Sequence, residues 1–239
     1  VTWSGFTTGG MNLGEDQDDT CCLANVFAAK WQKAIDGGAD LPDLYVVQIS
    51  VGGQGIAEFE VHGWNMWYSM RAPKLKPGVF GVCDISLYPL ATDILSLAVM
   101  NLIAAGKKPR IIGLHWNQWE TEADTGSKAL NDAEANYKNL FWGFFTALGS
   151  DENGTGITLY LYRPLCETLP ADRTKKLSDL FDTFTKSYAD CRMMDARESG
   201  FYDGTPRTHG IFQPDGGHYL PEVHRYFAER QWKDIFGNN

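Results

Sequence analysis

The sequence predicts an α/β protein in which helices cover both faces of a parallel central sheet. Three observations support this prediction. Short apolar runs rich in β-branched residues alternate with longer segments whose apolar residues recur at helical spacing. Glycine-rich turns separate these segments. Hydrophobic residues make up 44% of the 239 residues, enough for a sizeable core. No repeat or linker divides the chain, so a single domain is expected over residues 1–239.

Each segment is assigned from its local pattern. The predicted strands share a short, apolar, β-branched composition and are 44–50, 110–116, 157–162 and 191–196. The predicted helices share a 3.6-residue apolar period and are 23–35, 87–105, 130–148, 173–188 and 221–236. Pro221 stands in the first turn of the last helix, where its missing N–H costs nothing. Ligands of such sheets bind at the carboxyl ends of the strands, so the loops there are the informative ones.

Charge and composition exclude several classes of protein. The net charge of −9 argues against a nucleic-acid partner, because an acidic surface repels phosphate. Asp93 and Asn101 interrupt the most apolar stretch, so no membrane insertion is expected. The chain starts Val1-Thr2-Trp3 with no basic-then-apolar leader, so no signal peptide is expected.

The cysteines and aromatic residues bear on cofactors and ligands. The five cysteines fit no zinc motif, so free thiols and no metal or organic cofactor are expected. They are Cys21, Cys22, Cys83, Cys166 and Cys191. Aromatic residues make up 13% of the chain and include eight Trp. Trp residues either fill the core or offer flat faces to sugar rings, and composition alone leaves both uses open.

The segment Asp215-Gly216-Gly217-His218 precedes the last predicted helix. A serine hydrolase needs an imidazole that takes the proton of the nucleophile and a carboxylate that holds that imidazole in the right tautomer. An Asp three residues before a His, across two glycines, can fold back onto the ring. An exposed turn could have the same sequence, so this motif indicates a catalytic pair only when other motifs of a hydrolase accompany it.

Two further signals follow predicted strands. Trp116-Asn117-Gln118-Trp119-Glu120 follows the strand at 110–116, and an amide side chain there can donate to a developing oxyanion. Gly52-Gly53 follows the strand at 44–50, and glycine lets a backbone N–H approach a substrate oxygen. The alternatives are a polar loop and a tight turn. His115, inside a strand pattern, and His62, His209 and His224 are expected to be structural.

Together these motifs give the chain a resemblance to the SGNH hydrolases, and among them to the sialate O-acetylesterase-like carbohydrate esterases. The family has a Gly-Gly turn after its second strand, W-x-Q-G-E after its third and D-x-x-H before its final helix. The resemblance covers roughly residues 20–236 and departs from the family pattern at Trp119, where the family has Gly. It implies a three-layer α/β/α, flavodoxin-like fold.

The resemblance also implies roles for individual residues. His218 would be the general base and then the acid, oriented by Asp215. The backbone N–H of Gly53 and the side-chain amide of Gln118 would form the oxyanion hole, and Glu120 would brace the loop. Trp119, which narrows the pocket, and Trp64 would contact the substrate.

The nucleophile is the missing part of the pattern. The family has a Ser in a G-Q-S-N block after its first strand, and this sequence has no such block. The nearest candidate is Ser4, which only three residues precede. The alternative is that the first strand and the nucleophilic Ser lie upstream of residue 1, because an interior first strand is needed to pair its neighbours. A third alternative is a degenerate member that has lost its nucleophile.

The resemblance therefore predicts a carbohydrate O-acetylesterase of the Ser-His-Asp type that removes acetyl groups from a poly- or oligosaccharide. The rivals are a non-catalytic glycan-binding module and a lipase or thioesterase of the same superfamily. Members also occur in phage tail spikes, which would place the chain in a virion or outside the cell and would imply a homotrimer. Besides the other subunits of such a trimer, the expected partner is the acetylated glycan substrate.

Overall fold

The computed structural model describes residues 22–49, 55–56, 87–166, 168–204, 210–214 and 216–237. The fold is mixed α/β, as predicted. The described residues form two compact units. The first contains residues 55–56 and 87–193, and the second contains 22–49 and 194–237.

A small parallel sheet lies at the centre of the first unit and confirms the predicted parallel pairing. Its strands are β1 (Leu114–Trp116), β2 (Leu159–Tyr162) and β3 (Cys191–Met194), in the order β1-β2-β3. Leu114 is opposite Leu159, and Trp116 is opposite Leu161. All four residues of the middle strand β2 are buried, which is typical of a strand covered on both faces.

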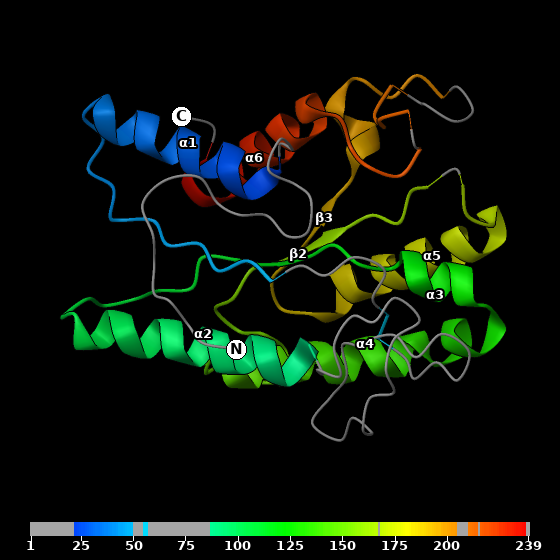
Figure 1. Cartoon of the computed structure of the whole chain (residues 1–239), viewed down its shortest axis with the longest axis horizontal. Helices are drawn as coiled ribbons and strands as arrows, with labels where there is room; N and C mark the ends of the chain where they lie inside the picture. The colour runs from blue at the N-terminus through cyan, green and yellow to red at the C-terminus, as the bar shows by residue number, and fades with distance from the viewer. Residues whose placement is uncertain are drawn as a thin grey trace, which may run out of the picture. The chain divides into compact units, whose positions relative to one another are not determined.

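Four helices belong to the first unit: α2 (Leu87–Ala104), α3 (Glu120–Thr125), α4 (Ser127–Ala147) and α5 (Ala171–Ser187). Helix α4 packs against α2, α3 and α5 (Figure 1). Aromatic rings fill the space between α4, α5 and β1. The Tyr137 and Phe181 rings meet edge to face at 5.1 Å, and the Phe141 and Phe184 rings meet in the same way at 5.8 Å. These four side chains have no exposed surface, so they form the core of the unit.

The second unit is built on two helices that lie side by side, α1 (Leu23–Asp36) and α6 (Pro221–Phe236) (Figure 1). The Trp31 and Trp232 rings meet edge to face at 6.0 Å. Lys30 forms an ion pair with Glu229 at 2.7 Å and lies 4.9 Å from the centre of the Trp232 ring. A short 3-10 helix, η1 (Ala196–Ser199), packs against α6. The predicted helices 23–35 and 221–236 are thus confirmed.

The structure differs from the predicted elements in two places. The segment 44–49 was expected to be a buried strand, but it forms no strand and the Tyr45 side chain is 38% exposed. No neighbouring strand among the described residues offers it a ladder of hydrogen bonds. The segment after β1 was expected to be a loop, but residues 120–125 form α3. Arg173 of α5 donates to the Ala123 and Asp124 carbonyls at 3.0 and 3.1 Å, which satisfies the end of this short helix.

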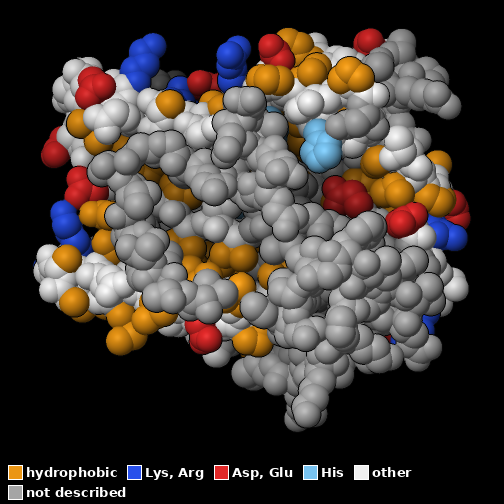
Figure 2. Space-filling model, in the orientation of Figure 1, with side chains coloured by type: hydrophobic (Ala, Val, Ile, Leu, Met, Phe, Trp, Pro, Cys, Tyr) orange, Lys and Arg blue, Asp and Glu red, His pale blue; other side chains and the backbone are white. Residues whose placement is uncertain are grey.

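Helix α2 is the most apolar of the described helices. By length and composition it is able to span a membrane, with a mean hydropathy of 1.6, and 22% of this 18-residue stretch is buried. Leu97, Met100 and Ile103 are 43%, 64% and 58% exposed. Figure 2 shows hydrophobic side chains gathered over this helix at the lower left. A core helix of a soluble protein passes the same test, so the absence of membrane insertion stays a prediction.

Two glycines in the turn before β2 allow a controlled test of packing. Gly154 has φ +73°, and a Cβ added there would lie 2.7 Å from Cζ of the buried Phe145. Gly156 has φ +83° and open space around it. Gly156→Ala should cost about 1 kcal/mol of unfolding free energy through its backbone alone. Gly154→Ala should cost roughly 1–2 kcal/mol more, because the Phe145 ring must also shift.

Urea unfolding of the two glycine variants checks this expectation. The Gly156→Ala chain is the matched control, since it shares the left-handed backbone and lacks the steric contact. Equal losses in the two variants would contradict the packing of Phe145 on Gly154.

Candidate active site

Gln118 lies two residues beyond the carboxyl end of β1, partly buried. Its Nε2 donates to Oε2 of Glu122 at 2.5 Å. The Tyr137 hydroxyl donates to the Gln118 backbone carbonyl at 3.0 Å and lies 3.4 Å from Gln118 Oε1. Both ends of the amide therefore have a polar partner in the orientation that the structure shows. The structure therefore places a held amide side chain at the strand end where ligands of parallel sheets bind.

Glu122 is the buried carboxyl group of this region, with no exposed surface. Besides the Gln118 amide, it accepts a hydrogen bond from the Ile56 backbone N–H, which is 2.6 Å from its Oε1. Burial raises the pKa of Glu122 to about 7, the nearby Glu120 adds to this, and the two hydrogen bonds oppose it. One carboxyl group thus joins Gln118 to Ile56, which follows Gly52-Gly53 in the sequence.

The two residues between Gln118 and Thr121 point in different directions. Trp119 is 1% exposed and lies in the core. A side chain so enclosed offers no face to a sugar in this conformation, so its predicted substrate contact would require a rearrangement. Glu120 is exposed and accepts from the Trp119 backbone N–H at 3.0 Å. Glu120 thus contacts only its neighbour in this hydrogen bond, whereas Glu122 links Gln118 to the distant Ile56.

His218 lies in a tight loop before α6. Phe212 and Tyr219 form an antiparallel bridge across the base of the loop, and their rings stack at 5.2 Å. Gln213 N donates to the His218 carbonyl at 2.7 Å. The His218 side chain is exposed at the surface of the second unit. The bridge and this hydrogen bond hold the turn, and the His218 imidazole lies at its surface.

The predicted site residues are only partly brought together by the described structure. Gln118, Trp119 and Glu120 are neighbours in the first unit, whereas His218 belongs to the second, and each group is described within its own unit. The other predicted site residues lie outside the described residues, and they are Ser4, Gly53, Trp64 and Asp215.

Two other histidines have structural surroundings, as expected. The His115 ring stacks on Tyr160 with centroids 4.5 Å apart, and its Nδ1 lies 3.3 Å from the Tyr162 hydroxyl. His224 contacts the Phe227 ring at 6.4 Å. Burial lowers the pKa of each to about 4, so both rings are neutral at physiological pH. His62 and His209 lie outside the described residues.

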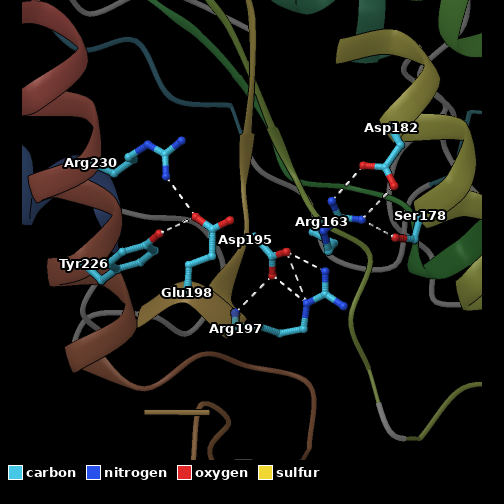
Figure 3. A network of polar contacts seen from close by, with 8 residues as sticks. All are labelled: Arg163, Ser178, Asp182, Asp195, Arg197, Glu198, Tyr226 and Arg230. Carbon is cyan, nitrogen blue, oxygen red and sulfur yellow. Dashed lines mark hydrogen bonds and ion pairs between the residues drawn. The ribbon is translucent and has the colours of Figure 1, made fainter. Parts of the chain in front are cut away.

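Charged groups near the ends of β2 and β3 are held in ion pairs (Figure 3). In the first unit, Arg163 donates to both carboxylate oxygens of Asp182, at 2.7 and 3.2 Å, and to Ser178 at 2.7 Å. In the second unit, Asp195 accepts from Arg197 Nη2 at 2.6 Å. The bidentate geometry of Arg163 indicates that it anchors the segment after β2 to α5.

Figure 3 also shows a second ion pair in the second unit, between η1 and α6. Glu198 accepts from the Tyr226 hydroxyl at 3.1 Å and from Arg230 at 2.9 Å. This pair fixes the 3-10 helix onto the helix that follows the His218 loop.

Glu122 is the residue of this region that sequence reasoning missed. Its signal was its closeness in sequence, because Glu122 lies four residues after Gln118, in the first turn of a helix that begins just beyond that residue. The signal was hidden because the segment was taken as a loop.

Neither known proteins nor metal-ligand clusters assign a function to this chain. The chain matches no protein-family model, no curated protein and no solved structure. Among the described residues, no group of three or more His, Cys, Asp or Glu side chains could hold a metal ion.

Proposed function

We propose that the chain is a serine-type O-acetylesterase that removes acetyl groups from a glycan, of the SGNH carbohydrate-esterase type. The observation that supports this most is the Gln118 amide at the carboxyl end of β1, fixed by the buried Glu122. A donor held in place before the reaction is what stabilisation of an oxyanion requires, because reorientation then costs nothing at the transition state.

The proposed reaction needs a general base for the nucleophile and an oxyanion hole for the developing negative charge. A Ser hydroxyl attacks the acetyl carbonyl while His218, oriented by Asp215, takes its proton. The oxygen that becomes negative receives hydrogen bonds from the Gln118 amide and the Gly53 backbone N–H. The sugar oxygen then leaves with the proton from His218, and an acetyl-enzyme forms. Water, deprotonated by the same imidazole, releases acetate. No cofactor takes part.

The fold agrees with this proposal at the level of strand order. In the flavodoxin-like order 2-1-3-4-5, strands three to five are neighbours in chain order. The order β1-β2-β3 is compatible with these three strands. The site also includes Glu120 as a support and Trp64 as a substrate contact. Trp119, which is 1% exposed, would contact the substrate only after a rearrangement that uncovers its ring. An extracellular or virion location, and a homotrimer in a tail-spike setting, belong to the same proposal.

The identity of the nucleophile has two candidates, Ser4 and a Ser upstream of residue 1. The test is the release of acetate from p-nitrophenyl acetate and from an O-acetylated polysaccharide by the wild-type chain and by Ser4→Ala. Turnover that disappears in Ser4→Ala assigns Ser4. Turnover that survives assigns another Ser, which mass spectrometry of the trapped acetyl-enzyme identifies.

The same assay separates the esterase from its rivals. Binding of the polysaccharide without acetate release would replace the esterase by a glycan-binding module. Faster turnover of long-chain acyl esters than of acetyl esters would replace it by a lipase or thioesterase.

A further inference from the structure

The Glu122 carboxyl group contacts two segments that are far apart in the sequence. Its Oε1 accepts from the Ile56 N–H at 2.6 Å, and its Oε2 accepts from Gln118 Nε2 at 2.5 Å. Ile56 and Glu122 have no exposed surface, so water does not replace either bond. An ionised carboxylate only accepts hydrogen bonds, so it requires the N–H end of the Gln118 amide to face it.

Protonation of Glu122 reverses this requirement. The oxygen facing Gln118 would then carry an O–H and need an acceptor. The Gln118 amide supplies one if it turns by half a rotation, so that Oε1 faces Glu122. The turned Nε2 would face the Tyr137 hydroxyl, now 3.4 Å from Oε1, which can accept while it continues to donate to the Gln118 carbonyl. In both arrangements the Glu122 carboxyl group, the Gln118 amide and the Tyr137 hydroxyl have hydrogen-bond partners in one another.

We propose that Glu122 is a positioning residue whose protonation sets the orientation of the Gln118 amide. The ionised form points the N–H end away from Tyr137, and the protonated form points it toward Tyr137. The catalytic consequence rests on the proposed function: only one orientation presents the amide N–H to the oxyanion.

Among the described residues, the charged or titratable groups near Glu122 include Glu120, Tyr137 and Arg173. Glu120, on the same helix, favours the protonated form, and Tyr137 comes from α4. Arg173 of α5 donates to the Ala123 and Asp124 carbonyls. The raised pKa of Glu122, about 7, places the change of orientation within the physiological range.

Side-chain amide NMR tests the reorientation without any substrate. In a chain labelled with ¹⁵N-glutamine, Gln118→Leu identifies the Gln118 resonance by its loss. The resonance should shift between two limiting positions as pH rises, with a midpoint near pH 7. In Glu122→Gln, a neutral isostere of the protonated carboxyl, it should stay at the low-pH position throughout. The matched control is Glu134→Gln, an exposed carboxylate paired with Lys138, which should titrate as wild type does.

Tyr137→Phe provides a second variant, because it removes the acceptor of the turned amide. The midpoint should then move to lower pH. A Gln118 resonance that does not shift in wild type, or that shifts equally in Glu122→Gln, overturns the inference.

Kinetics separate this inference from the esterase proposal. Glu122→Gln should lower kcat for p-nitrophenyl acetate by about 10²-fold with little change in KM, as loss of one oxyanion donor does. Unchanged kcat in this variant overturns the catalytic role of the reorientation. No turnover in wild type at any pH counts against the esterase, and the amide titration still decides whether Glu122 sets the orientation.

Discussion

Replacing His218 with alanine is expected to lower kcat/KM for acetyl esters by about 10³-fold, roughly 4 kcal/mol of transition-state stabilisation. Without the imidazole, the Ser hydroxyl keeps its proton and the leaving sugar oxygen receives none. His218 is exposed in a turn closed by the Phe212–Tyr219 bridge, and its side chain contributes little to the core. The loss should therefore appear in catalysis and leave the unfolding midpoint in urea nearly unchanged.

The matched control for this prediction is His209→Ala, which removes another imidazole of the same Gly- and Pro-rich stretch of sequence. Free imidazole groups hydrolyse activated esters, so an O-acetylated polysaccharide is the decisive substrate. His209→Ala should change kcat/KM on it by less than about twofold. More than a tenth of wild-type activity in His218→Ala would contradict the role of general base.

The helices were predictable because their apolar periodicity is a local property of the sequence. Helices α1, α2, α4, α5 and α6 begin and end within three residues of the predicted bounds. Strands depend on a partner that the local sequence does not contain. The β-branched run at 44–49 therefore misled the prediction, and the first four residues of the run at 110–116 lie outside β1. Packing and pairing, rather than composition, decide such segments.

In the candidate site, too, the features that depend on local sequence were predictable and those that depend on tertiary packing were not. Gln118 was identifiable because an amide follows a predicted strand. Glu122 was not, because its burial depends on the Ile56 N–H, 66 residues away in sequence, and on the packing of α3 against α4 and α5. The burial of Trp119 was missed for the same reason. Sequence patterns find polar residues near a site, but they do not show which of them are desolvated.

The stability of the chain should depend on pH through Glu122. Burial raises the pKa of this carboxyl group in the folded state from 4.5 to about 7. Below pH 4.5 both the folded and the unfolded state hold the proton, and the full stability is present. As pH rises toward 7, the unfolded chain releases the proton first, so the folded state loses free energy relative to it. At about 1.4 kcal/mol per pH unit, the loss is about 3 kcal/mol.

A comparison of wild type with Glu122→Gln isolates this term, because His115 and His224 act in the opposite direction. Their pKa values are lowered to about 4, so these rings cost stability as pH falls below 6.5. They are present in both chains and cancel in the difference. Glu122→Gln should therefore gain about 3 kcal/mol over wild type between about pH 4.5 and pH 8 in urea unfolding. Glu134→Gln is the control for the removal of an exposed, ion-paired carboxylate. A difference between Glu122→Gln and wild type that does not vary with pH would mean that Glu122 ionises as easily in the folded chain as in the unfolded one. In that case the hydrogen bonds from the Ile56 N–H and the Gln118 amide, which favour the ionised form, would offset the effect of burial on the Glu122 pKa in full.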